Sequence, residues 1–419
     1  MGPFDKVLRI SRQLWIVVVM GIVLHTTSAA SEAEPAWVAQ LTATLGNGAL
    51  LVEDQSGRTV LDLHADETFV PASILKLATS ACALLTLPNN YRFQTSFHYG
   101  TNGVLYVKGF GDPALTSEEL AQAARGLRGR GVHDVRGIVL DDSFFAPHLA
   151  IDGQSASANP YDAQNSALLA NFNTIFIRKA KNGQVVSAEP QTPITAMTLD
   201  LAKGLRAGTH RINVSRDSGK ALLYVGHLLK AFFEHEGVAV AGEITAGRVP
   251  NGLAATYVHT SSQSLPHLIR ALLENSNNLM TNQLFLTMGA QKFGPPATVE
   301  KGQAVMHECL KTQFGWRNFV VMEGSGLSKQ NQVTAHQMMR LVRFFERYRD
   351  LVPMKEPPFQ AKTGTLNGVS TLAGFFDTPS RHHYRFVLML NAPGVGYWSK
   401  FKVAKLLYDG LSGTMLSKK

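Results

Sequence analysis

The stretch PASILK at residues 71–76 places Ser73 and Lys76 three positions apart, where an apolar run predicts a helix to about residue 87. At that spacing two helical side chains lie on one face. A serine hydroxyl becomes nucleophilic when a neighbouring base removes its proton, and a desolvated lysine is such a base. The same pattern also arises by chance, as a helix-start serine beside a solvated lysine. The stretch therefore gains meaning only from motifs further along the chain.

Two further short motifs follow it in order. Ser276 and Asn278 form Ser-x-Asn at the start of a predicted helix, and Lys-Thr-Gly at residues 362–364 ends a predicted strand, before Thr365. Alone, the first is explained as a helix-cap cluster and the second as a strand end with a turn. Together with Ser-x-x-Lys they are the set typical of penicillin-binding proteins and serine β-lactamases.

If the three motifs meet in one cleft, they predict covalent catalysis. Ser73 would attack a substrate carbonyl, and Lys76 would take its proton, because burial and the nearby ammonium of Lys362 lower the pKa of Lys76. The backbone N–H groups of Ser73 and Thr365 would hold the oxyanion. Ser276 would pass a proton to the leaving amine, and water would hydrolyse the acyl-enzyme.

The remaining residues of the motifs are predicted to hold the substrate. Asn278 would orient Lys76 and a substrate amide. A substrate carboxylate would bind to Lys362, with Thr363 and Thr365. Gly364 has no side chain, which would let the substrate lie along the strand edge. We expect no cofactor and no metal, and we interpret His382-His383 as a solvated turn.

Composition and charge restrict the class of protein. The 419 residues are enough for two or three domains, and 45% hydrophobic and 17% charged residues are typical of a globular protein. The net charge of +9 favours an anionic polymer or peripheral contact with a membrane surface. No basic block or zinc-finger spacing predicts nucleic-acid binding.

The N-terminus has the layout of a secretory signal peptide. Lys6, Arg9 and Arg12 precede the apolar run LWIVVVMGIVL at 14–24, and small residues follow at 27–30. The apolar run is too short for the roughly 20 residues that span a bilayer. We therefore predict cleavage near residue 29 or 30 and an exported, periplasmic, soluble protein.

The two cysteines are Cys82 and Cys309. Cys82 lies in the apolar helix that follows Ser73, so the sequence favours two buried free thiols over a bridge.

Periodicity divides the chain at residues 1–30 (signal peptide), 31–90, 91–262 (a β-rich inserted region) and 263–419. Thr116 and Ser264 are placed to cap helices, the former in a capping box. The simplest assembly is an α/β (α+β) fold with an antiparallel sheet covered by helices, in which the first hairpin joins the late strands. The expected strands are 49–52, 59–63, 92–99, 104–108, 137–140, 174–177, 210–214, 359–362, 370–376 and 384–391, and the expected helices are 73–87, 116–127, 222–235, 264–274, 278–288, 298–310, 334–348 and 398–411.

Over nearly the whole mature chain the sequence resembles the D-alanyl-D-alanine carboxypeptidase/endopeptidases of the penicillin-binding protein 4 type. Besides the three motifs, the resemblance includes GFGDP at 109–113, DDSFF at 141–145, NFN at 171–173 and GSGLS at 324–328. Ser276 also follows Ser73 by 203 positions, a gap that leaves room for inserted domains. The resemblance implies a penicillin-binding, β-lactamase-like transpeptidase domain acting on peptidoglycan stem peptides, with β-lactams as covalent inhibitors.

Some features depart from the family pattern. Asn277 and Glu323 each stand where the family commonly has aspartate, the segment before Lys362 is short, and the inserted region is trimmed. Two alternatives therefore stay open beside the carboxypeptidase or endopeptidase: a serine β-lactamase-like hydrolase, and a degenerate, non-catalytic peptidoglycan-binding protein.

Overall fold

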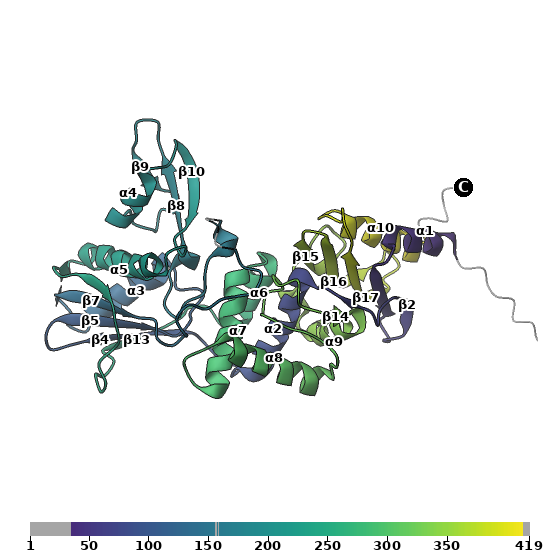
Figure 1. Cartoon of the computed structure of the whole chain (residues 1–419), viewed down its shortest axis with the longest axis horizontal. Helices are drawn as coiled ribbons and strands as arrows, with labels where there is room; N and C mark the ends of the chain where they lie inside the picture. The colour runs from purple at the N-terminus through teal and green to yellow at the C-terminus, as the bar shows by residue number, and fades with distance from the viewer. Residues whose placement is uncertain (1–34, 156, 158, 414–419) are drawn as a thin grey trace, which may run out of the picture.

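The computed structural model describes residues 35–155, 157 and 159–413, so the predicted signal peptide lies outside the described residues. Within these ranges, no helix has both the length and the hydrophobicity needed to cross a bilayer. The molecule is elongated, with residues 91–262 at one end and a large sheet at the other (Figure 1). We call residues 91–262 the inserted region and the rest of the described chain the main region.

The main region is built on a five-stranded antiparallel sheet in the order β15-β16-β17-β1-β2. Strand β1 pairs with β17, with Ala49 opposite Met389, so the first and last parts of the chain share one sheet. Strand β15 forms one edge of the sheet and β2 the other. The strands are β1 (Ala49–Asp54), β2 (Thr59–Leu63), β15 (Gln360–Leu366), β16 (Val369–Asp377) and β17 (His383–Asn391).

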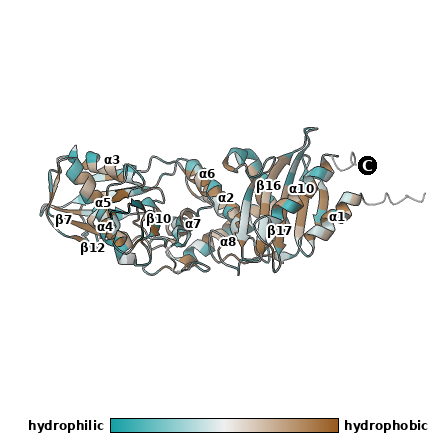
Figure 2. Ribbon diagram, turned by 90° about the horizontal axis from the view of Figure 1, so that it is seen from above, coloured by the Kyte–Doolittle hydropathy of each residue, from teal (hydrophilic) through white to brown (hydrophobic). Residues whose placement is uncertain are grey.

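Strands β16 and β17 are largely buried on both faces and rich in apolar residues (brown stretches of ribbon in Figure 2). Leu50 and Leu388 pack with the terminal helices, whereas Leu51 and Met389 pack with the central helices. The predicted antiparallel sheet covered by helices is confirmed. The helices of the main region are α1 (Ala36–Leu45) and α10 (Ser399–Leu411) on one face, and α2 (Lys76–Thr86), α6 (Leu265–Glu274), α7 (Asn278–Phe293), α8 (Val299–Phe314) and α9 (Ala335–Phe345) on the other.

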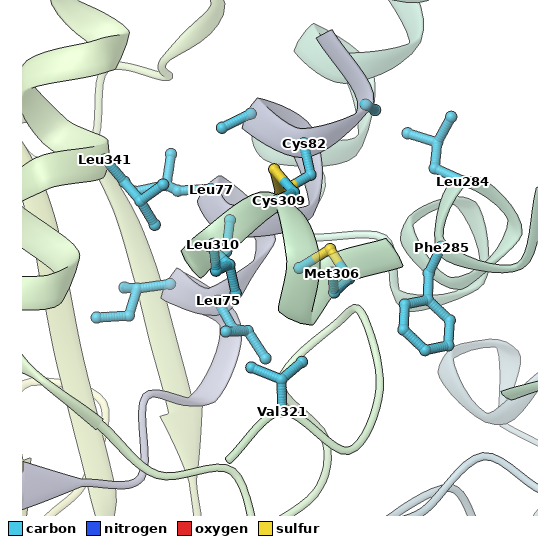
Figure 3. Close-up of a cluster of buried hydrophobic side chains, with 14 of the residues drawn as sticks. Leu75, Leu77, Cys82, Leu284, Phe285, Met306, Cys309, Leu310, Val321 and Leu341 are labelled. Carbon is cyan, nitrogen blue, oxygen red and sulfur yellow. A yellow bond between two sulfur atoms is a disulfide. The ribbon is translucent and has the colours of Figure 1, made fainter. Parts of the chain in front are cut away.

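Helix α2 runs through the centre of the helical layer and is fixed to α8 by a disulfide between Cys82 and Cys309 (Figure 3). The prediction of two free thiols is wrong. Burial, which favoured that prediction, is compatible with a bridge because the two helices cross within the core and bring the Cα atoms to 5.9 Å. The two residues are 227 positions apart, so sequence spacing gave no sign of the pairing.

The inserted region has its own apolar core, between a second five-stranded sheet and the helices α3 (Ser117–Arg128) and α5 (Ser218–His235) (Figure 1). A smaller three-stranded sheet projects from it together with α4 (Ala196–Ala202). The second sheet has the order β12 (Ile244–Ala246), β7 (Gly137–Asp141), β5 (Val104–Gly109), β4 (Gln94–Tyr99), β13 (Tyr257–Thr260), and the smaller one the order β10 (Gly208–Asn213), β8 (Thr174–Lys179), β9 (Val185–Ser187).

Local structure differs from prediction at several points. A 3-10 turn, η1 (Ala72–Leu75), precedes α2, so the predicted helix at Ser73 begins later as an α-helix. Lys-Thr-Gly does not end a strand, because β15 continues to Leu366 along β16. Neither Thr116 nor Ser264 makes the predicted side-chain cap, although both stand at the N-cap position.

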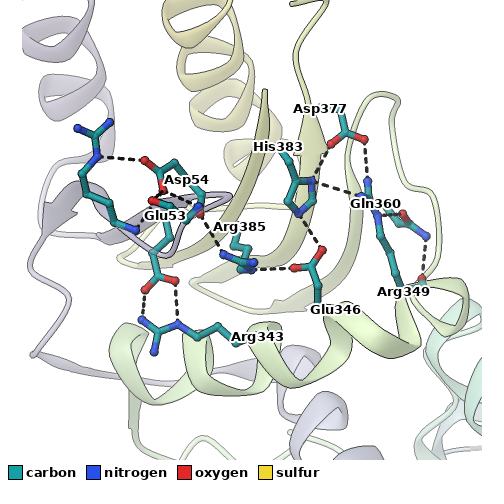
Figure 4. Close-up of polar contacts among 11 residues, drawn as sticks. Glu53, Asp54, Arg343, Glu346, Arg349, Gln360, Asp377, His383 and Arg385 are labelled. Atoms are coloured by element: carbon teal, nitrogen blue, oxygen red, sulfur yellow. Dashed lines mark hydrogen bonds and ion pairs between the residues drawn. The ribbon is translucent and has the colours of Figure 1, made fainter. Parts of the chain in front are cut away.

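A polar network holds the start of β15 against the turn η4 (Glu346–Leu351) that follows α9 (Figure 4). Arg349 donates to Gln360 Oε1 at 2.6 Å and to Asp377 Oδ2 at 2.9 Å. The predicted solvated turn is correct for His382, which is exposed before β17, but wrong for His383, which lies in β17 between Asp377 and Glu346. The hydrogen bonds of Arg349 hold the short segment before Lys362 against the sheet.

Candidate active site

Ser73 and Lys76 meet at the junction of η1 and α2. Lys76 Nζ lies 3.1 Å from Ser73 Oγ. The turn is held in place by Thr371 of β16, whose hydroxyl donates to Pro71 O at 2.7 Å. Ser73 is half-buried, whereas Lys76 is completely buried. The spacing of three residues thus places the hydroxyl beside the amine, as predicted, although the connecting backbone is a 3-10 turn.

The amine of Lys76 has three partners from three segments. Besides Ser73 Oγ, Nζ donates to Asn278 Oδ1 and to Ser325 O, each at 2.7 Å. Burial lowers the pKa of Lys76 to about 7, and the nearby carboxylate of Glu323 opposes that shift. A substantial fraction of Lys76 is therefore neutral at pH 7, and neutral lysine has a lone pair with which to accept the Ser73 proton.

Glu323 organises the loop that supplies the Ser325 carbonyl. Its buried carboxylate accepts from the backbone N–H groups of Ser325, Gly326 and Leu327, at 2.7 to 2.8 Å. Gly326 has φ +83°, and a Cβ there would lie 1.9 Å from Ala72 O, so this loop fits against the serine turn only with glycine. Sequence reasoning noted Glu323 as a departure from aspartate, but missed this positioning role.

The Ser-x-Asn motif lies between α6 and α7. Asn277 caps α7, since its side chain accepts from Met280 N at 2.9 Å, and Asn278 then begins the helix with its amide oxygen on Lys76. Asparagine and aspartate cap helices about equally well, so the departure at Asn277 preserves the local structure. Ser276 has φ +51° and receives a hydrogen bond from Lys362 Nζ at 2.9 Å.

Strand β15 closes the site. Lys362 is completely buried, and its pKa is lowered well below the ordinary value, by burial first and then by repulsion from the ammonium groups of Lys76, Lys355 and Lys400. A Cβ on Gly364 would lie 2.9 Å from Ser73 N, so the edge strand runs directly beside the serine turn. The three motifs are thus linked pairwise and form one site.

The two threonines of β15 differ in their surroundings. Thr363 is half-buried, and its carbonyl accepts from Lys362 Nζ at 2.7 Å. Thr365 is exposed, and its hydroxyl accepts from the amine of Lys400, on α10, at 2.6 Å. Sequence reasoning missed Lys400. The available signal was its spacing of three and seven residues from Val403 and Leu407, which places it on the buried face of α10.

A pocket of about 230 Å³ adjoins the Ser-x-Asn loop. Its near wall is formed by Ser276 and Asn278, and its far wall by residues of the inserted region that include Tyr161 and Arg211. The inserted region therefore borders the site directly. In the described ranges, no group of three or more His, Cys, Asp or Glu side chains is arranged to hold a metal ion.

Comparison with known proteins agrees with this geometry. The D-Ala-D-Ala carboxypeptidase 3 (S13) family matches residues 40–207 and 190–351. A D-alanyl-D-alanine carboxypeptidase of Actinomadura sp. (strain R39) is 25% identical over 80% of this chain and 75% of its own. The D-alanyl-D-alanine carboxypeptidase DacB of Haemophilus influenzae is 24% identical over 83% of this chain and 86% of its own.

Solved structures share the fold. The crystal structure of penicillin-binding protein 4 from H. influenzae has a TM-score of 0.73 at 20% identity, over 90% of this chain and 99% of that one. The same protein complexed with a β-lactam has a TM-score of 0.69. The predicted fold class and the resemblance to the penicillin-binding protein 4 type are confirmed. The chain belongs to the D-Ala-D-Ala carboxypeptidase 3 (S13) family of serine peptidases.

Proposed function

We propose that the protein cleaves D-Ala-D-Ala termini, or the related peptide crosslinks, of peptidoglycan stem peptides through an acyl-enzyme on Ser73. Membership of the S13 family makes it a D-Ala-D-Ala carboxypeptidase of the serine type. The observation that carries the mechanism is the amine of Lys76, buried and 3.1 Å from Ser73 Oγ. It supplies the base that a serine nucleophile requires.

The proposed chemistry follows the contacts of the site. Neutral Lys76 accepts the Ser73 proton as Oγ attacks the carbonyl, and the N–H groups of Ser73 and Thr365 stabilise the oxyanion. The proton taken by Lys76 passes to the leaving amine through the hydroxyl of Ser276, which Lys362 holds, so that Lys76 is neutral again. Asn278 keeps Lys76 aimed at Ser73. Water then releases the acyl group, and Lys362, Thr363 and Thr365 hold the substrate carboxylate, beside the backbone of Gly364.

β-Lactams are the proposed covalent inhibitors, because their strained amide can be attacked by the same serine. A related fold, that of H. influenzae penicillin-binding protein 4, has been solved with a β-lactam. The β-lactamase alternative has no specific observation in its favour. The non-catalytic alternative rested on the short segment before Lys362, and that segment is closed by hydrogen bonds from Gln360 to Arg349 and Val352.

We also propose export to the periplasm. The basic and apolar leader supports it, and so does the disulfide, since such bonds persist in oxidising compartments. Peripheral contact of the basic protein with a membrane surface remains a prediction.

The test is covalent labelling with a fluorescent penicillin. Wild type should be labelled and Ser73→Ala should not, whereas Ser80→Ala, a buried serine on α2 outside the site, serves as the matched control. Mass spectrometry of digested crosslinked muropeptides then separates loss of a terminal D-Ala from cleavage of a crosslink. Labelling of Ser73→Ala at another residue would overturn the mechanism, and labelling without turnover of any muropeptide would favour the non-catalytic binder.

A further inference from the structure

Lys400 is a completely buried lysine at the start of α10, on the face of the sheet away from α2. Its amine donates to Gly364 O at 2.8 Å and to Thr365 Oγ1 at 2.6 Å. It therefore contacts the strand segment that lies beside Ser73. Its amine also lies 4.6 Å from the centre of the Tyr397 ring.

The charge of Lys400 has no carboxylate partner. Among the residues that the structure describes, it forms no ion pair with an acidic side chain, although burial of an unpaired ammonium is costly. Burial lowers the pKa of Lys400 to about 8, so the amine is still mostly protonated at pH 7. A positive charge is thus held just beneath the exposed edge of β15, where an anionic ligand would compensate it.

Lys400 also fixes the role of the Thr365 hydroxyl. An ammonium donates and cannot accept, so Thr365 Oγ1 is the acceptor in this contact. The hydroxyl proton must then point away from Lys400. Because Thr365 is exposed, that proton is available to a ligand at the edge of β15, next to Gly364 and Ser73.

We propose that Lys400 is a positioning residue that makes the Thr365 end of β15 selective for substrates with a free carboxylate on the leaving-group side. Lys400 orients the Thr365 hydroxyl so that it donates a hydrogen bond to the ligand, and it places an unpaired positive charge next to that hydroxyl. The preferred class is peptides with an anionic terminus and β-lactams with a free carboxylate, over their esters and amides. This inference rests on the proposed function, because it concerns the substrate of the same site.

The test compares acylation rates with benzylpenicillin and with its methyl ester. Wild type should prefer the acid, and Lys400→Met should lower the rate with the acid by about 10- to 100-fold, the effect of losing one charge-assisted hydrogen bond, while leaving the rate with the ester unchanged. Lys400→Arg should restore the preference. Lys402→Met, an exposed lysine on the same helix, is the matched control and should behave as wild type.

The outcomes separate three explanations. Equal losses with acid and ester in Lys400→Met would show a merely structural role and overturn the proposal, as would an unchanged ratio. If Lys400→Met does not fold, Thr365→Val must show the same selective loss with the acid, and a wild-type ratio in that variant overturns the proposal as well. Failure of wild type to be acylated by either compound would instead refute the proposed function.

Discussion

The main region and the inserted region differ in whether they bury lysine side chains. Within the described residues, the completely buried lysines are Lys76, Lys362 and Lys400, and all belong to the main region. Both regions bury carboxylates, such as Glu323 in the main region and Asp141 in the inserted region, which accepts from Ser143 N and Val249 N. The carboxylate of Asp141 holds two loops together at little cost, because backbone N–H groups satisfy it.

Burial of an amine costs more free energy, because a lysine loses its hydration and regains only the hydrogen bonds that the fold supplies. Three buried lysines on or beside strand β15 therefore indicate a functional site, where the fold tolerates a loss of stability. The comparison teaches that the predicted catalytic residues lie in the main region, and that the inserted region contributes an apolar core of its own and one wall of a pocket. Each prediction below tests part of that contrast.

Removing the base should have the largest effect on activity. We expect Lys76→Met to slow acylation by penicillin by about 10²–10⁴-fold, the usual contribution of a positioned base. Thermal stability should change less than activity, because the cost of burying the amine is removed while Asn278 Oδ1 and Ser325 O lose a donor. Stopped-flow acylation and calorimetry measure the two effects. An acylation rate equal to wild type would show that another group takes the Ser73 proton.

Removing an apolar side chain from the inserted region should lower stability and leave the acylation rate unchanged. Phe233 is completely buried in α5, and Phe233→Ala should cost about 3–5 kcal/mol of unfolding free energy in that region. Acylation at temperatures where the variant is folded should be unchanged. Phe293→Ala, which removes a half-exposed ring, is the control. If acylation and the inserted core are lost in a single melting transition, the two regions are not independent.

The disulfide should stabilise the main region. Replacing Cys82 and Cys309 together by alanine should cost about 2–5 kcal/mol of unfolding free energy, because the bond closes a long loop in the unfolded chain. Urea denaturation of the double variant measures the loss, and reduced wild type should show the same shift. Equal midpoints for oxidised wild type and the double variant would contradict this stabilisation.

Acylation should rise with pH and level off above the pKa of Lys76, about 7, since only the neutral amine accepts a proton. Below that value the rate should fall about tenfold per pH unit.

Glu323 raises the pKa of Lys76, so Glu323→Gln should move the rising limb of the pH–rate profile to lower pH. The folded state binds fewer protons than the unfolded chain above pH 7, so this group makes stability increase as pH rises toward 10.5. If Glu323→Gln leaves the rising limb of the pH–rate profile unchanged, that limb belongs to the titration of another group.

The smallest effect is expected at Asn277. Asn277→Asp should keep the cap of α7 and change stability by less than about 0.5 kcal/mol. Asn277→Ala should cost about 0.5–2 kcal/mol through loss of the cap. Chemical denaturation of both variants measures the difference. Equal losses in the two would show that the cap does not stabilise α7.

The sequence predicted the sheet, the helices on it and the meeting of the three motifs, because these follow from periodicity and from residue types that share one chemistry. It did not predict the disulfide or the position of Lys-Thr-Gly within β15, since both depend on tertiary contacts. The structure brings the predicted Ser73, Lys76, Ser276, Asn278 and Lys362 together, while their chemical roles remain predictions. Lys400 was missed because a single lysine on a helix carries no motif, and only packing distinguishes it from an exposed one.

The pairing of β1 with β17 has a consequence for how the protein is made. A ribosome completes β1 more than 300 residues before β17, so the sheet stays open until almost the whole chain has been synthesised. Lys362 and Lys400 are also added late. A partly made chain therefore has its serine without the strand beside it, and the site can assemble only once the chain is nearly complete.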